Sequence, residues 1–118
     1  MKKFILLSVT ITTLIAACTS QKKVEYDFPA AMLPHVKIAY EQICDKGQAL
    51  YAINCAGCHN VKKKRQQVIP DFDPEKLKGY ELRVSNARHE SSMPDTLVTA
   101  EELAIITTFL SYKKKNSR

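Results

Sequence analysis

The sequence lacks an apolar run long enough to cross a lipid bilayer. The longest mostly apolar stretch of the 118-residue chain, residues 4–17, includes Ser and Thr, whereas a membrane-spanning helix needs about 20 apolar residues. The chain also lacks internal repeats and low-complexity tracts, and no two segments form a convincing pair of strands. These absences leave one small, all-α domain as the expected fold.

The sequence also has no acidic surplus. Its formal net charge is +6, and the charge falls to +4 if residues 1–17 are removed, because Lys2 and Lys3 are the only charged residues among them. A modest positive charge on an exported protein favours an acidic protein partner or a membrane surface. We therefore expect no binding to nucleic acid.

The N-terminal stretch "MKKFILLSVTITTLIAAC" has the layout of a secretory signal, with two lysines, an apolar run and small residues before Cys18. Its end, "LIAAC", resembles the lipobox of bacterial lipoproteins, which implies cleavage before Cys18 and acylation of that cysteine. An ordinary signal peptide is the alternative. We expect residues 1–17 to be removed, 18–34 to form a lipidated tether and 35–118 to form the domain, anchored on the periplasmic side of the cell membrane or outer membrane.

Three helices are predicted from apolar periodicity and capping residues. The first runs from Val36 to about Ala52, the second begins after Asp73 with Pro74 at its first position and extends towards residue 87, and the third spans Ala100–Tyr112. Thr99 and Glu102 have the spacing of a capping box for the third helix. Three helices with substantial loops bury little apolar area, so a large apolar cofactor is expected to add stability.

Four cysteines in an exported chain could form two disulfides, but their positions argue otherwise. Cys18 is expected to carry lipid, and Cys55 and Cys58 belong to one motif. Cys44 is left beside a helical apolar stripe, where a buried free thiol is the common outcome. An intermolecular disulfide through Cys44 is the alternative.

The stretch "NCAGCHN" contains Cys55, Cys58 and His59 in the order Cys-x-x-Cys-His. A thioredoxin-type dithiol would follow a strand, whereas this motif follows a predicted helix. A structural zinc site would need a second pair of ligands, and none follows in the sequence. The spacing is that of c-type haem attachment, in which both sulfurs bind the porphyrin edge and the histidine reaches the iron.

The segment "GQALYAINCAGCH" resembles the pattern that precedes the haem in class I cytochromes c, with Gly47, Leu50 and Tyr51 ahead of the motif. The resemblance covers roughly residues 36–114 and implies the class I cytochrome c fold around one haem c attached through Cys55 and Cys58. It also implies that the last helix crosses the first at Gly47, with Ile106 and Phe109 at the crossing.

The resemblance further implies the iron ligands. His59 is the first ligand, and Met93 in "SSMPDTL", 34 residues later and just before the last helix, corresponds to the second. Pro70 corresponds to a proline whose carbonyl accepts a hydrogen bond from the ligand histidine, which fixes its orientation. The short spacing leaves His89 as a competing ligand and an open sixth position as a further alternative.

The expected function is single-electron transfer between respiratory redox partners, and not enzymatic catalysis, because two bound ligands leave iron no open site. The partners implied are a membrane-bound oxidase or reductase, with the membrane itself contacted through lipid on Cys18. The charge run at 61–67 is read as a solvated loop, with docking to an acidic partner as the alternative. A haem enzyme or gas-binding sensor with an open or displaceable sixth ligand is the rival function.

Overall fold

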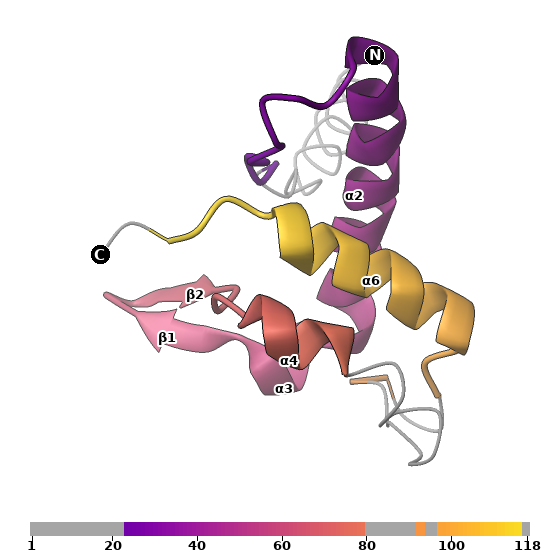
Figure 1. Ribbon diagram of the computed structural model, residues 1–118. Coiled ribbons are helices and arrows are strands. Elements are labelled where there is room, and N and C mark those ends of the chain that lie inside the picture. The colour runs from indigo at the N-terminus through magenta and orange to yellow at the C-terminus, as the bar shows by residue number, and fades with distance from the viewer. Residues whose placement is uncertain (1–22, 80–91, 94–96, 117–118) are drawn as a thin grey trace, which may run out of the picture.

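The computed structural model describes residues 23–79, 92–93 and 97–116. Its elements are α2 (Pro34–Asn54), α3 (Ala56–His59), the strands β1 (Val61–Lys63) and β2 (Gln66–Val68), α4 (Pro74–Lys78) and α6 (Ala100–Tyr112). Figure 1 shows α6 crossing the long α2, with α3, α4 and the two strands gathered at the lower end of α2. Within the described part of the chain, no helix has the length and apolarity to span a membrane.

The first predicted helix is confirmed but is longer than expected. Pro34, at the first position of α2, has no amide hydrogen to leave unpaired, and the helix continues to Asn54. Its buried residues include Cys44 and Tyr51, whereas Ile43 is 39% exposed. Cys44 is a free thiol with 0% exposure, which confirms the prediction for it.

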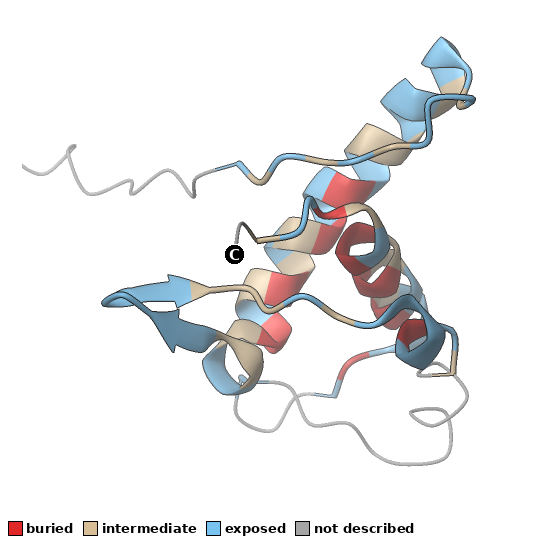
Figure 2. Ribbon diagram, turned by 60° about the vertical axis from the view of Figure 1, so that its left-hand side comes forward, coloured by how far each residue is buried: buried red, intermediate tan, exposed pale blue. Residues whose placement is uncertain are grey.

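The crossing of α2 and α6 is centred on Gly47. An added Cβ at Gly47 would lie 2.5 Å from Cβ of Phe109 and 2.6 Å from the carbonyl oxygen of Ile105, so the two backbones approach too closely for any side chain at this position. Ile106 and Phe109 are 2% and 0% exposed on the α6 side. The predicted crossing is therefore confirmed, and the buried residues follow it along both helices (Figure 2).

Capping residues define the two later helices as the sequence predicts. Thr99 and Glu102 form both halves of the capping box that begins α6, and each half satisfies an otherwise unpaired amide. The Asp73 side chain accepts a hydrogen bond from the Glu75 amide at the start of α4. The described part of this helix ends at Lys78, and the predicted continuation towards residue 87 lies outside the described residues.

The expectation of a loop at 61–67 without strands was wrong. Residues 61–68 form an antiparallel hairpin in which Val61 pairs with Val68 and Lys63 with Gln66. Lys64 and Arg65 form its two-residue turn with φ of 47° and 68°. Positive φ at both turn positions suits a tight hairpin, but Asn-Gly is the usual pair there. The pair Lys64-Arg65 therefore gave no turn signal in the sequence.

The tether predicted for residues 18–34 is shorter than expected, because residues 23–28 lie against the domain. Tyr26 forms a β-bridge with Lys113, and the Asp27 amide donates to the Tyr112 carbonyl at 2.8 Å. The Tyr26 ring packs edge-on to Phe109, with 6.4 Å between ring centroids. We call residues 23–28 the N-terminal strap, because they join the end of α6 to α2.

Gly47→Ala should lower the free energy of unfolding of the haem-loaded protein by about 3 kcal/mol, near the upper end of the usual cost of overpacking a core. The new methyl group would overlap Phe109 and the Ile105 backbone, and backbone cannot rotate away. Chemical denaturation measures the change. Lys46→Ala is the matched control, because Lys46 is the exposed neighbour of Gly47 on α2. Equal stabilities of the two variants would contradict the close crossing.

Candidate functional site

The motif residues lie on a short helical turn that begins where α2 ends. Cys55 has φ of −121° and ψ of −35°, outside the helical range, so the chain changes direction there and α3 starts at Ala56. The amide of His59 donates to the carbonyl of Cys55 at 2.9 Å. Residues four apart in a helical turn are neighbours on one face, so Cys55 and His59 face the same side.

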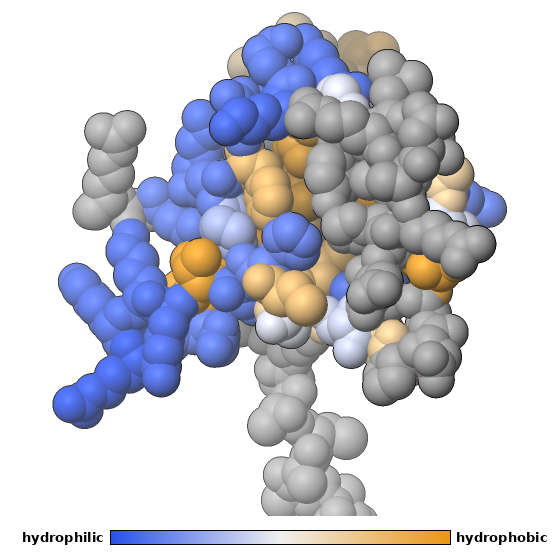
Figure 3. Space-filling model, turned by 90° about the horizontal axis from the view of Figure 1, so that it is seen from below, coloured by the Kyte–Doolittle hydropathy of each residue, from blue (hydrophilic) through white to orange (hydrophobic). Residues whose placement is uncertain are grey.

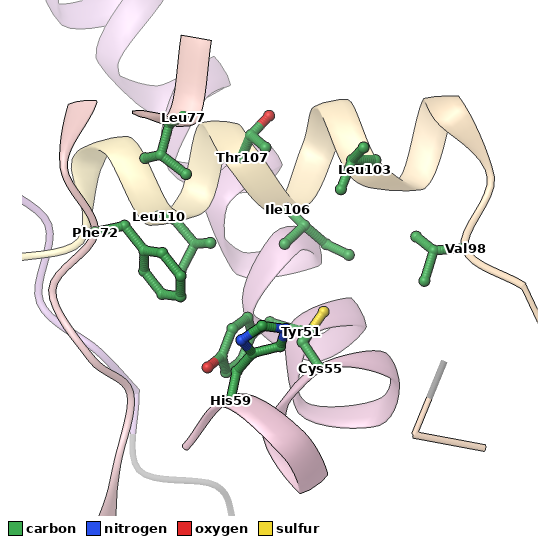
Figure 4. Close-up of a pocket in the computed structure, with 10 residues that line it drawn as sticks. All are labelled: Tyr51, Cys55, His59, Phe72, Leu77, Val98, Leu103, Ile106, Thr107 and Leu110. Carbon is green, nitrogen blue, oxygen red and sulfur yellow. The ribbon is translucent and has the colours of Figure 1, made fainter. Parts of the chain in front are cut away.

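That side opens on an apolar hollow between α3, α4 and α6. Ten residues line it: Tyr51, Cys55, His59, Phe72, Leu77, Val98, Leu103, Ile106, Thr107 and Leu110. Figure 4 shows the His59 ring and the Cys55 sulfur at its floor, with Phe72, Leu110 and Ile106 above them. Seen from below, the centre of this end of the molecule is apolar and a hydrophilic lobe projects beside it (Figure 3).

The lining of the hollow has the chemistry that a haem requires. Cofactor sites are concave and mostly apolar, with few polar groups. Here the polar side chains of the lining are those of Tyr51, His59 and Thr107. The Tyr51 hydroxyl donates to Oδ1 of Asn60 at 3.0 Å, and Thr107 donates to the Ala104 carbonyl at 3.0 Å. His59 lines the floor of the hollow, where a ligand histidine is expected.

The two thiols differ in their surroundings. Cys55 is 8% exposed, and burial, followed by the nearby Cys58, raises the pKa of its thiol to about 11. Cys58 is exposed. Among the described residues, no cluster of His, Cys, Asp and Glu has the makings of a metal site.

Met93 directly follows a residue that is hydrogen-bonded to the end of α2, a contact that the sequence spacing did not reveal. The amide and the hydroxyl of the preceding Ser92 both donate to the Asn54 carbonyl, at 2.7 and 3.0 Å. Asn54 is the last residue of α2, directly before Cys55. The Met93 side chain is 47% exposed and is not among the residues that line the hollow. Its ligation of iron stays a prediction.

Pro70 is half-buried in the segment between β2 and α4, and its predicted hydrogen bond with the ligand histidine also stays a prediction. The same segment contains Phe72, which sequence reasoning missed. The Phe72 and His59 ring centroids are 6.4 Å apart, at 58°. Phe72 and Leu77 occupy the two positions of a hydrophobic staple around the Asp73 cap, a pattern that could have identified Phe72 as a lining residue.

Two predicted functional residues lie outside the described residues. Cys18 belongs to 1–22, and His89, the competing ligand, belongs to 80–91. Lipidation and the choice between Met93 and His89 therefore stay predictions.

The helical fold, the Cys-x-x-Cys-His turn and the apolar hollow above it together define a c-type haem domain. Residues 44–96 match the family model described as Cytochrome c. This stretch of the chain is therefore a cytochrome c domain, which supports assignment to the class I cytochrome c family. Comparison with curated proteins and with solved structures gives no significant match.

The family assignment gives the coarse function and the cofactor. The domain carries one covalently attached haem c, with Cys55 and Cys58 as the cysteines of the attachment motif. A haem-binding electron carrier is the function that this domain supports.

Gly57→Ala should disturb the neighbourhood of Met93. An added Cβ at Gly57 would lie 2.9 Å from Oγ and 3.1 Å from Cβ of Ser92, so Ser92 must move relative to Asn54. We expect a loss of about 1 kcal/mol in stability, measured by chemical denaturation of the haem-loaded protein. The double variant Gly57→Ala, Ser92→Gly should recover most of this loss, because it removes both close atoms. A double variant no more stable than Gly57→Ala would show that Ser92 is not the obstacle.

Proposed function

We propose that this protein is a membrane-tethered electron carrier of the periplasm, in which His59 and Met93 are the axial ligands of a single haem. The observation that carries the proposal is that His59 and Cys55 face one apolar hollow, while Cys58 of the same motif is exposed. When bound, the haem supplies a one-electron couple at iron. The chain's own residues bind and orient it and exclude water.

The ligand assignment is supported by the position of each residue. His59 lies in the lining and packs near Phe72, so its ring is held on the hollow side of α3. Met93 follows Ser92, which is hydrogen-bonded to the end of α2 beside the motif. A thioether is a soft ligand that raises the reduction potential relative to a second histidine. Two side-chain ligands leave iron available for electron exchange and closed to small substrates.

Electrons are expected to leave through the exposed edge at Cys58. Cys58 is exposed, and Val61, three residues later, is 48% exposed. Outer-sphere transfer needs close approach of the partner and no open coordination site. The enzyme reading is therefore the less favoured one.

The basic hairpin is a candidate docking element for an acidic redox partner. Residues 61–68 contain Lys62, Lys63, Lys64 and Arg65 and no acidic residue, and the hairpin begins directly after the haem motif. Lys64 and Arg65 adopt positive φ, a conformation that non-glycine residues rarely adopt. The two-residue turn places these charges at the tip of the hairpin that follows the motif, where opposite charge on a partner would accelerate encounter.

The N-terminal strap makes the proposed tether short. If Cys18 carries lipid, only five residue steps separate it from Lys23, where the strap begins, and these span at most about 18 Å. Lys23 is paired with Asp45 at 3.2 Å and Lys114 with Glu25 at 2.7 Å. The domain would therefore stay next to the bilayer, which favours a membrane-bound oxidase or reductase as partner.

One observation favours the rival function of a haem enzyme or gas sensor. Met93 is 47% exposed and is not among the residues that line the hollow, and an iron without a methionine ligand has a position open to a small ligand. The ferric spectrum distinguishes the two functions, since a methionine–iron charge-transfer band supports the carrier and a high-spin spectrum supports the rival.

Met93→Ala should open the sixth position, so that the reduced protein binds carbon monoxide, while Met93→His should keep haem and lower the reduction potential, which axial ligands tune over about 0.8 V. Covalent attachment should survive in both, because Cys55, Cys58 and His59 are unchanged. Spectroscopy and redox titration measure these changes, with Met32→Ala as the matched control. An unaltered low-spin spectrum and potential in Met93→Ala would reject Met93, and His89 would be tested next.

Replacing Lys62, Lys63 and Lys64 by Gln should slow oxidation of the reduced protein by ferricyanide about tenfold at low ionic strength, because the hairpin attracts the anion. The difference should shrink above about 0.1 M salt, where the screening length falls to about 10 Å. The control replaces the exposed lysines Lys37, Lys46 and Lys76, which lie on α2 and α4. Equal rates in the two variants would show that the hairpin has no special role.

A further inference from the structure

The end of α6 is joined to the segment between β2 and α4 by polar contacts around Asp71. Nζ of Lys113 donates to Oδ1 of Asp71 at 2.8 Å, and the amide of Asn116 donates to both Asp71 oxygens at 3.1 Å. The Asn116 side chain donates to the Ile69 carbonyl at 2.9 Å. We call Asp71, Lys113 and Asn116 the Asp71 clamp.

The clamp is partly withdrawn from water. The Lys113 side chain is 4% exposed and that of Asp71 is 37% exposed. A lysine so deeply buried requires a charged or polar partner, and here Nζ of Lys113 contacts the Asp71 carboxylate and the Lys114 carbonyl, the latter at 3.0 Å. Unlike the exposed pairs of the strap, this ion pair is therefore expected to have a defined geometry.

The clamped segment has no regular secondary structure of its own. Residues 69–73 lie between the last residue of β2 and the first of α4 and belong to neither. Its position therefore depends on tertiary contacts: the clamp on Ile69 and Asp71, and the packing of the Ile69 and Phe72 side chains against the core.

The same segment forms the wall of the hollow beside His59. Phe72 follows Asp71 directly, and its ring lies 6.4 Å from that of His59. Figure 4 shows both rings in the hollow, Phe72 from the clamped segment and His59 from α3. A shift of Asp71 would therefore move a ring that limits how His59 can turn.

We propose that the Asp71 clamp positions the His59 ring through Phe72, and so tunes the haem from outside the hollow. This proposal rests on the proposed function, since it requires His59 to be an iron ligand. Asp71, Lys113 and Asn116 are positioning residues, because none of them lines the hollow. The last residues of the chain thereby influence the ligand that follows the attachment motif.

Variants of the three residues distinguish an effect of the His59 ring position from an effect of charge near the haem. Asp71→Asn removes one negative charge. Lys113→Met removes one positive charge and retains an apolar side chain of similar length, and Asn116→Ala changes no charge. A purely electrostatic effect on the haem would shift the reduction potential in opposite directions for the first two variants and leave it unchanged in the third. Loss of positioning would act in the same direction in all three. Asn116→Ala keeps the backbone amide that donates to Asp71 but removes the side-chain donor to the Ile69 carbonyl and to Oδ1 of Asp71, so its effect should be the smallest.

The experiment uses the full haem-loaded chain. The hyperfine-shifted proton resonances of the His59 ring are recorded in the ferric state, and the reduction potential is measured by redox titration. We expect the His59 resonances to move in the same direction in all three clamp variants, with potential shifts of one sign. Lys114→Gln is the matched control: Lys114 adjoins Lys113 but is 64% exposed and pairs with Glu25 of the strap. It should leave the His59 resonances in place.

Two outcomes would overturn the proposal. Potential shifts of opposite sign in Asp71→Asn and Lys113→Met, with unchanged His59 resonances, would assign the effect to charge alone. Lowered stability with unchanged resonances and potential would make the clamp purely structural. Asn116 is only partly buried near the chain end, so Asn116→Ala keeps the test decisive if the other variants fail to fold. If the parent protein itself shows no His59 resonances shifted by iron, the ligand assignment fails and not the clamp.

Discussion

The close crossing of α2 and α6 at Gly47 is the contact on which the rest of the structure depends. Because no side chain separates the backbones there, Tyr51, Ile106 and Phe109 meet in one core, with the Tyr51 and Phe109 ring centroids 6.1 Å apart. The same crossing places the face of α6 that carries Leu103, Ile106 and Leu110 above the haem motif. The hollow therefore exists because two helices distant in sequence approach closely.

The site is built where the regular helix stops. At Cys55 the backbone leaves the helical range, and the single turn of α3 brings Cys55 and His59 to one face. Two separate later segments of the chain complete this turn's surroundings, with Ser92 bound to Asn54 and Phe72 beside His59. A rigid helix end thus supplies the reference point, and irregular segments complete the surroundings.

The sequence predicted the structure correctly where a side chain bonds to residues within one turn of itself. The capping box at Thr99 and the cap at Asp73 were predicted because such caps involve residues within one turn. The hairpin at 61–68 was missed because Lys64 and Arg65 are unusual residues for its turn. The strap was assigned to the tether because its partners, Tyr112 and Lys113, lie far away in the sequence.

The sequence by itself determined the chemistry of this protein. The spacing of Cys55, Cys58 and His59 specifies covalent haem attachment, since the three side chains must reach fixed points of one ligand. Only the tertiary structure decided what surrounds them: that Phe72 lies against His59, that Lys113 is buried with Asp71, and that the chain before α2 lies along the domain. These contacts join residues that are 13, 42 and 87 positions apart, and their geometry follows from how helices pack, which no local pattern encodes.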